Sequence, residues 1–175
     1  VAGDEKQSAI IRDGFGTAAT FQSPQMIAVA NDGAVYVTDV CTIRKVAPTP
    51  TRRVSTFAGL AGQECFGPQE GASVGFARFD NPTGLAFDNL GNLYVADTGS
   101  KVIQRIALDG RVSVLDLREA NGQPVSPAYF SGLAVTRAGR LLVPAFPSQT
   151  FNANCFSSAI LVQSDCTPPT PPNLT

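Results

Sequence analysis

The fold is decided by residues 79–106, which read FDNPTGLAFDNLGNLYVADTGSKVIQRI. Residues 21–46 read FQSPQMIAVANDGAVYVTDVCTIRKV and give the same residue types in the same order, from an opening Phe and Pro through Gly and Tyr-Val to Asp and a closing aliphatic pair. A weaker third copy begins at Phe130 as FSGLAVTRAGRLLVPAF and ends near residues 159–162. Self-similarity of this kind indicates a repeat architecture.

The copies are spaced like propeller blades with some extra length. Their matching glycines, Gly33, Gly91 and Gly139, lie 58 and 48 residues apart, whereas a minimal blade takes about 40 to 45 residues. Asn-Leu-Gly, Thr-Gly and Asp-Gly turns divide the second copy into hairpins. We therefore predict an all-β fold of about three four-stranded antiparallel blades. The expected strands are 26–30, 34–38, 42–46 and 53–57 in the first copy and 83–88, 92–96, 101–107 and 111–115 in the second.

The expected blades cover approximately residues 1–57, 58–115 and 116–165, and the Pro-rich tail 166–175 is expected to be extended. Residues 1–3 align with residues 57–59, so we expect the chain to open on the last strand of a blade. Closed propellers have four to eight blades. Three blades are therefore an excerpt of a longer chain, a unit that associates with a second copy, or an open arc, and the sequence leaves all three open.

These units resemble the NHL-repeat β-propellers over about residues 1–165. The resemblance is strong in the second copy, good in the first and weak in the third, where Leu142 replaces the tyrosine and Ala145 replaces the aspartate. It implies the propeller fold. It does not imply a function, because propellers host both binding and catalysis.

Composition excludes several function classes. The chain has 13 basic and 14 acidic residues and a net charge of −1, so it offers no positive field for nucleic acids. It contains no histidine, which excludes a His-based triad and the His-ligated metal of the amidating lyases that resemble this family. Apolar runs such as residues 159–162 are too short to cross a bilayer. We expect no enzyme activity, no cofactor, no metal and no membrane insertion.

The four cysteines, Cys41, Cys65, Cys155 and Cys166, lack a C-x-x-C spacing. Disulfides are favoured over free buried thiols, and we favour Cys41–Cys65 and Cys155–Cys166 because each pair falls within one repeat. A glycosylation sequon at Asn173 lies beside the Thr-Pro-Pro repeats. Together these features predict a secreted or cell-surface protein.

Two aspartates, Asp39 and Asp97, close the second strand of their copies. They could hold calcium through carboxylate oxygens. We favour a turn-capping role, in which each carboxylate accepts hydrogen bonds from backbone amides ahead of it.

Three cations and two aromatic residues also invite a functional interpretation. Arg44, Lys45 and Arg105 are expected to be solvated or paired with carboxylates rather than to bind RNA. Phe21 and Phe79 recur at one repeat position, so we expect them to wedge between blades.

The sequence therefore predicts an extracellular, non-catalytic propeller module that binds a protein or glycan or serves as an assembly scaffold. Its partners would be a second copy or the remaining blades of a longer chain. The alternative is a fragment of a lyase-like or hydrolase-like propeller enzyme whose catalytic residues lie outside this chain.

Overall fold

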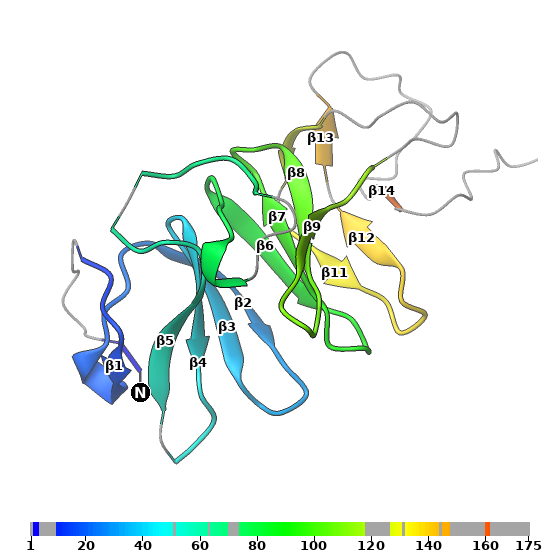
Figure 1. Ribbon diagram of the computed structural model, residues 1–175. Helices are drawn as coiled ribbons and strands as arrows, with labels where there is room; N and C mark the ends of the chain where they lie inside the picture. The colour runs from blue at the N-terminus through cyan, green and yellow to red at the C-terminus, as the bar shows by residue number, and fades with distance from the viewer. Residues whose placement is uncertain are drawn as a thin grey trace, which may run out of the picture.

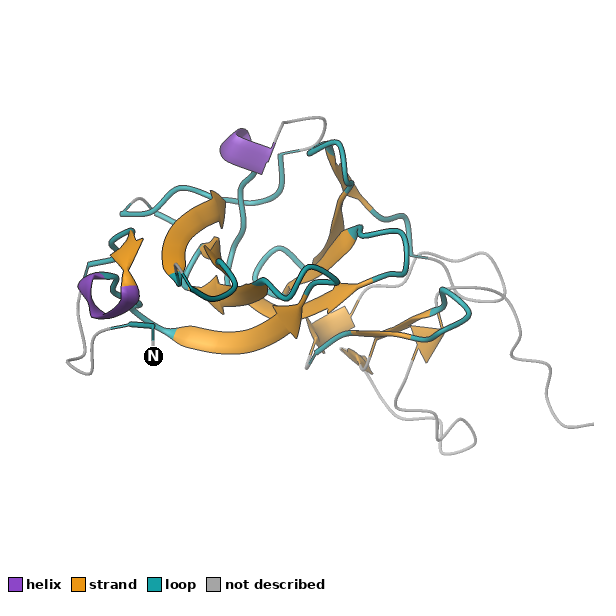
Figure 2. Ribbon diagram, turned by 90° about the horizontal axis from the view of Figure 1, so that it is seen from below, coloured by secondary structure: helices purple, strands orange, loops and turns teal. Residues whose placement is uncertain are grey.

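The computed structural model shows four antiparallel sheets, which form three successive units along the chain, with only two single-turn helices (Figures 1 and 2) among the residues that it describes. Those residues are 2–3, 10–50, 52–62, 64–69, 74–117, 127–130, 132–143, 145–147 and 160–161. No helix in these ranges is long and apolar enough to cross a bilayer. The predicted all-β fold is confirmed.

The first blade is a sheet of four meandering strands with a short fifth strand on its outer edge. The strands are β1 (Gly14–Phe15), β2 (Pro24–Val29), β3 (Val35–Asp39), β4 (Thr42–Val46) and β5 (Arg53–Ala58), in the spatial order β1-β5-β4-β3-β2. A 3-10 helix, η1 (Gly16–Ala18), follows β1. The four predicted strands are confirmed to within two residues at each end.

The second blade repeats this meander without the added edge strand. Its strands are β6 (Pro82–Phe87), β7 (Leu93–Asp97), β8 (Val102–Ile106) and β9 (Val112–Val114), in the order β6-β7-β8-β9. The other 3-10 helix, η2 (Val74–Phe76), lies in the segment between the two blades. Gly91 and Gly110 take φ values of 83° and 85° in the hairpin turns, which a residue with a side chain adopts only at a cost.

The third unit is shorter and divided. Its inner sheet contains β11 (Ala134–Val135), β12 (Leu141–Val143) and β14 (Ile160–Leu161), and β10 (Pro127–Phe130) pairs separately with β13 (Ala145–Pro147). Residues 160–161, near the expected end of the third copy, form β14. The Pro-rich tail 166–175 lies outside the described residues.

The opening of the chain differs from the prediction. Residues 2–3 belong to no strand, because Gly3 turns the chain with a φ of 97° and donates its N–H to the Gly16 oxygen. Residues 14–15 pair with β5 instead. The outer edge of the first blade is thus completed by β1.

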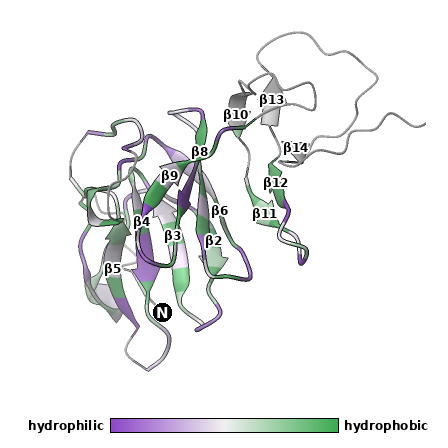
Figure 3. Cartoon of the chain, turned by 45° about the vertical axis from the view of Figure 1, so that its right-hand side comes forward, coloured by the Kyte–Doolittle hydropathy of each residue, from purple (hydrophilic) through white to green (hydrophobic). Residues whose placement is uncertain are grey.

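The inner strands β2, β6 and β11 lie side by side and carry hydrophobic residues (Figures 1 and 3). Alternate residues of a strand point to opposite faces of its sheet, so each blade has two packing faces. We call the face that looks back toward the preceding blade the leading face and the other the trailing face. On the inner strands, the leading face carries Ile27 and Val29 in the first blade, Leu85 and Phe87 in the second, and Leu133 and Val135 in the third unit. The trailing face carries Ala28, Ala86 and Ala134 in the same order.

The core consists of trailing faces packed on leading faces. Tyr36, on the trailing face of the first blade, contacts Phe87 of the second edge to face, with ring centroids 5.0 Å apart. Phe79 lies between the two blades and is 1% exposed, as predicted for a wedge. Phe21, at the same repeat position of the first blade, is only half-buried. A second cluster joins the second blade to the third through Ala96, Ile103, Leu141 and Val143.

We expect Phe79→Ala to lower the free energy of unfolding by about 3 to 5 kcal/mol, because it leaves a cavity between two blades. The control Leu90→Ala removes a side chain that is 77% exposed and should change stability by less than about 0.5 kcal/mol. Urea unfolding followed by circular dichroism measures both. Equal effects from the two substitutions would contradict the wedge role.

Candidate functional site

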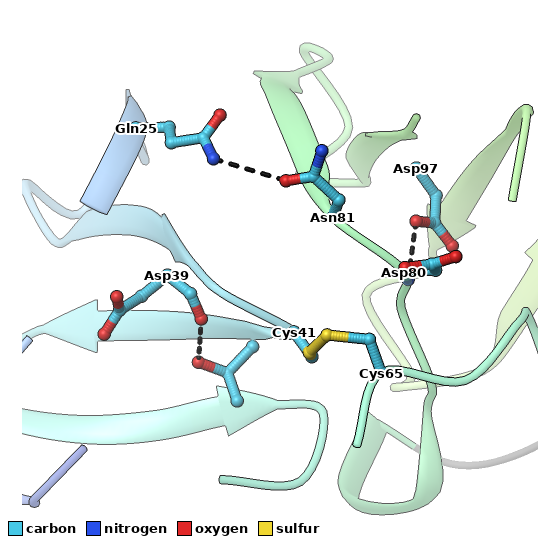
Figure 4. Close-up of a disulfide and its surroundings, with 8 residues drawn as sticks. Gln25, Asp39, Cys41, Cys65, Asp80, Asn81 and Asp97 are labelled. Carbon is cyan, nitrogen blue, oxygen red and sulfur yellow. Dashed lines mark hydrogen bonds between the residues drawn. A yellow bond between two sulfur atoms is a disulfide. The ribbon is translucent and has the colours of Figure 1, made fainter. Parts of the chain in front are cut away.

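Asp39 and Asp97, the two aspartates singled out in the sequence, lie at one end of the blades, where β2 and β6 begin and β3 and β7 end (Figure 4). We call this region the loop end. Gln25 of the first blade donates an amide hydrogen to Asn81 of the second over 3.3 Å, which joins the two blades here. The loop end is therefore the place to look for binding or catalytic chemistry.

Asp39 is fully buried at the loop end of the first blade. Its carboxylate accepts hydrogen bonds from the backbone N–H groups of Gln22, at 3.0 Å, and Ser23, at 2.6 Å. The Arg44 guanidinium lies 3.5 Å from its other oxygen. The charge of Asp39 is thus matched by a cation and by backbone donors.

Arg44 is also fully buried, so it does not form part of a basic surface. It donates to the Thr20 and Arg12 carbonyl oxygens at 3.0 and 3.1 Å and forms an ion pair with Asp13 at 2.9 Å. Its guanidinium lies 5.3 Å from the centre of the Phe21 ring. Arg44 therefore ties residues 12–21 to the first blade, and this function was missed in the sequence. The strand register, which places Arg44 opposite Val37 on a covered face, was the available signal.

The second blade repeats this arrangement with a neutral side chain. Asp97 is fully buried and accepts the Asp80 N–H at 2.7 Å. Gln104, at the position of Arg44, donates to Asp97 over 3.0 Å and to the Arg78 carbonyl oxygen over 2.8 Å. Burial, with a smaller contribution from the Asp80 charge, raises the pKa of Asp97 to about 6, against the effect of its hydrogen bonds.

The two aspartates accept backbone hydrogen bonds, but the predicted donors are wrong. We expected amides ahead of each aspartate, in the turn that follows it. The donors Gln22, Ser23 and Asp80 instead belong to the segments that lead into β2 and β6. An aspartate at the end of β3 or β7 lies beside the start of the neighbouring inner strand, as the pairs Pro24↔Asp39 and Pro82↔Asp97 show. The carboxylates therefore fix the entry of each inner strand.

The loop end is crosslinked by a disulfide between Cys41, in the β3–β4 turn, and Cys65, in the segment between the blades (Figure 4). This is the pairing favoured from the sequence. Gly59 passes so close to Cys41 that an added Cβ would lie 2.4 Å from the Cys41 oxygen. The disulfide thus holds the linking segment against the first blade. Cys155, Cys166 and Asn173 lie outside the described residues.

Asp39 and Asp97 are poorly placed to bind a metal, because their oxygens already accept hydrogen bonds from N–H donors. Within the part of the chain that the structure describes, no group of three or more His, Cys, Asp or Glu side chains is placed to hold a metal ion. The other candidate cations have local roles. Lys45 lies over the Tyr36 ring, 5.3 Å from its centre, and Arg105 donates to Asn92 at 2.8 Å.

The leading face of the first blade provides a different kind of candidate site. Ile27 and Val29 are 61% and 60% exposed, whereas Leu85, at the position of Ile27 in the second blade, is 4% exposed. Leu85 is covered by the trailing face of the first blade. Arg12, Thr20 and Phe21 contact Arg44 on the outer part of the first leading face, whereas Ile27 and Val29 on β2 remain exposed. This strip has the composition of a blade interface.

Comparisons with known proteins agree with this geometry. A family model described as NHL repeat matches residues 79–106. The chain is 37% identical over 121 residues to SUPPRESSOR OF QUENCHING 1, a chloroplastic protein of Arabidopsis thaliana, and this match spans 66% of the chain and 11% of the plant protein. The chain is thus much shorter than this relative.

Two solved structures share the fold. An auxiliary nutrient binding protein from Bacteroides thetaiotaomicron superposes with a TM-score of 0.55 at 17% identity, over 67% of this chain and 33% of that one. A luciferin-regenerating enzyme superposes with a TM-score of 0.50 at 15% identity, over 80% of this chain and 42% of that one. At these identities the likeness shows the β-propeller fold alone, and the neighbours include both a binding protein and an enzyme.

The predicted secreted or cell-surface location is wrong. The plant relative is a chloroplastic protein. Cysteines and a sequon were weak evidence for an extracellular location, because a disulfide reports oxidising conditions rather than one compartment and a three-residue sequon recurs by chance.

We expect the stability of the folded chain to depend on the titration of Asp97. Because folding raises the pKa of Asp97 from 3.8 to about 6, the favourable contribution of its protonated form is complete below pH 4 and is lost as the pH rises through 6. A shift of this size corresponds to about 3 kcal/mol. Asp97→Asn should flatten the fall in unfolding free energy between pH 4 and 7, as measured by urea unfolding. The control Asp109→Asn, in an exposed turn, should retain it, and an unchanged profile in Asp97→Asn would contradict this account.

We expect the double substitution Cys41→Ser and Cys65→Ser to lower the free energy of unfolding by about 2 to 4 kcal/mol, because the crosslink closes a loop with a sequence separation of 24. Reductant should destabilise the wild-type chain more than the variant in thermal unfolding, and the difference between the two responses isolates the Cys41–Cys65 crosslink. A variant as stable as the oxidised wild type would show that the crosslink does not contribute.

Proposed function

We propose that this chain, which belongs to the NHL-repeat β-propellers, is a non-catalytic scaffold that binds a protein partner through the open leading face of its first blade. The observation that carries the proposal is the contrast between Ile27 and Leu85, which hold one repeat position at 61% and 4% exposure. An apolar strip of this kind is stabilised when a partner removes it from water, by about 25 cal/mol for each Å² buried.

The loop end supports a structural role for the polar residues. Asp39 is engaged by two backbone amides and Arg44, and Asp97 by one amide and Gln104. Carboxylates used in this way hold the inner strands in place. The disulfide adds a further restraint at the same end. A rigid frame of this kind is suited to presenting a fixed surface.

The exposed polar side chains of the loop end offer a second surface, on which a glycan or protein could form hydrogen bonds. Gln22, Ser23, Gln25 and Asn81 are exposed there. The apolar strip remains the primary surface in this proposal, because it has a direct counterpart that is buried in the same molecule.

We expect the wild-type chain to associate as its concentration rises, and the double substitution Ile27→Asp and Val29→Lys to abolish this association without lowering the melting temperature, since both residues are exposed. The matched control is Leu90→Asp with Leu108→Lys. These leucines are 77% and 80% exposed, more than Ile27 and Val29, but lie in hairpin turns outside the leading face. Static light scattering over a concentration series measures all three proteins.

Loss of association in both double variants would mean that general hydrophobicity is responsible. A wild-type chain that stays monomeric at all concentrations would remove the evidence for this scaffold function.

A further inference from the structure

We propose that the leading face of the first blade binds the trailing face of the third unit of a second copy, so that two chains join head to tail. The inference rests on the proposed scaffold function and names its partner. Three cross-strand pairs recur in the same register, and the described units already form two interfaces with one another.

The trailing face is built in the same way in every unit. On the inner strand an alanine lies directly opposite a large residue of the next strand, as Ala28↔Tyr36 in the first blade and Ala86↔Tyr94 in the second. The third unit has Ala134↔Leu142 at this position. Ala28 and Tyr36 pack in the cluster between the first two blades, and Tyr94 packs in the cluster between the second blade and the third unit. Ala86 is buried. In the third unit Ala134 is exposed and Leu142 is half-buried.

The leading faces provide the matching surface. In the second blade Leu85 pairs with Val95 and Phe87 with Leu93, and Leu85, Val95 and Leu93 are all buried against the first blade. In the first blade Ile27 pairs with Val37 and Val29 with Val35. The same positions are thus apolar in both blades, and the two on the inner strand are exposed only in the first.

Leu142 on the trailing face of the third unit and Val29 on the leading face of the first blade are also matched in size. Within the chain, Tyr36 meets the Phe87 ring, and Tyr94 packs in the same cluster as the smaller Val135. The proposed contact places Leu142 against Val29, so a shorter residue on the trailing side meets a shorter one on the leading side. Volume matching of this kind preserves close packing, which overpacking or a void would lose.

A small residue on the trailing side also determines which faces can meet. An added Cβ at Gly84 would lie 2.9 Å from the carbonyl carbon of Gly132, so successive inner strands approach too closely for bulky residues on both sides. Two leading faces would oppose Ile27 and Val29 with their own copies, without a row of small residues. The head-to-tail contact places Ala134 there instead.

Head-to-tail contacts generate either a closed ring or an open filament. Two copies of the three described units, joined through two equivalent contacts, would give a ring of six units, which lies within the range of four to eight blades known for propellers. Each copy would then cover the open strip of the other. We therefore expect a dimer.

The direct test places the photo-crosslinking residue p-benzoylphenylalanine at position 27 and mixes this protein with an isotope-labelled wild-type chain. We expect a dimer by light scattering and, after irradiation, a crosslink from position 27 to a labelled peptide that contains residues 132–143. A dimer crosslinked from position 27 to the labelled peptide around Ile27 would overturn the head-to-tail contact and leave the scaffold function standing. A monomer without crosslinks would overturn both.

A pair of matched substitutions tests the trailing side independently. Ala134→Asp should weaken dimerisation by about tenfold or more, because it buries a carboxylate at the contact. The control Ala138→Asp introduces the same charge at an exposed turn residue of the same unit and should leave the dissociation constant unchanged. Circular dichroism confirms that both variants fold. Equal dissociation constants for the two variants would contradict the assignment of Ala134 to the interface.

Discussion

The packing of one blade's trailing face on the next blade's leading face is the interaction on which the rest of the structure depends. A single four-stranded meander cannot bury its hydrophobic faces by itself. It needs a neighbouring blade to form a core. Tyr36, Phe79 and Phe87 provide that core between the first two blades. The buried polar groups and the disulfide act at its edge, where they fix the entry of each inner strand.

Successive repeats stabilise their buried aspartate with different partners. The carboxylate that anchors the inner strand is buried in both blades, and burial of a charge is costly without a partner. The first blade supplies Arg44, which also binds residues 12–21, whereas the second supplies the neutral Gln104. Burial raises the pKa of Asp97. The two repeats thus share a geometry but give their buried carboxylates different partners.

The fold could be predicted from the sequence because turn residues and alternating hydrophobic residues recur in the same order in successive copies. The strands of the first two blades were placed to within two residues for this reason. The donors to Asp39 and the burial of Arg44 could not be predicted, because both depend on segments that are distant in sequence and come together only in the sheet. The location was missed for another reason: cysteines and sequons report chemistry more than compartment.

The central claim is that the strip formed by Ile27 and Val29 is an open counterpart of the interface that buries Leu85. Nuclear magnetic resonance of methyl groups in the presence of a soluble paramagnetic agent tests it most directly. At low protein concentration we expect strong relaxation enhancement at the Ile27 and Val29 methyl groups and little at Leu85, and at high concentration we expect the first two to become protected. Methyl groups of Ile27 and Val29 that are already protected at low concentration, or that stay accessible at every concentration, would contradict the account.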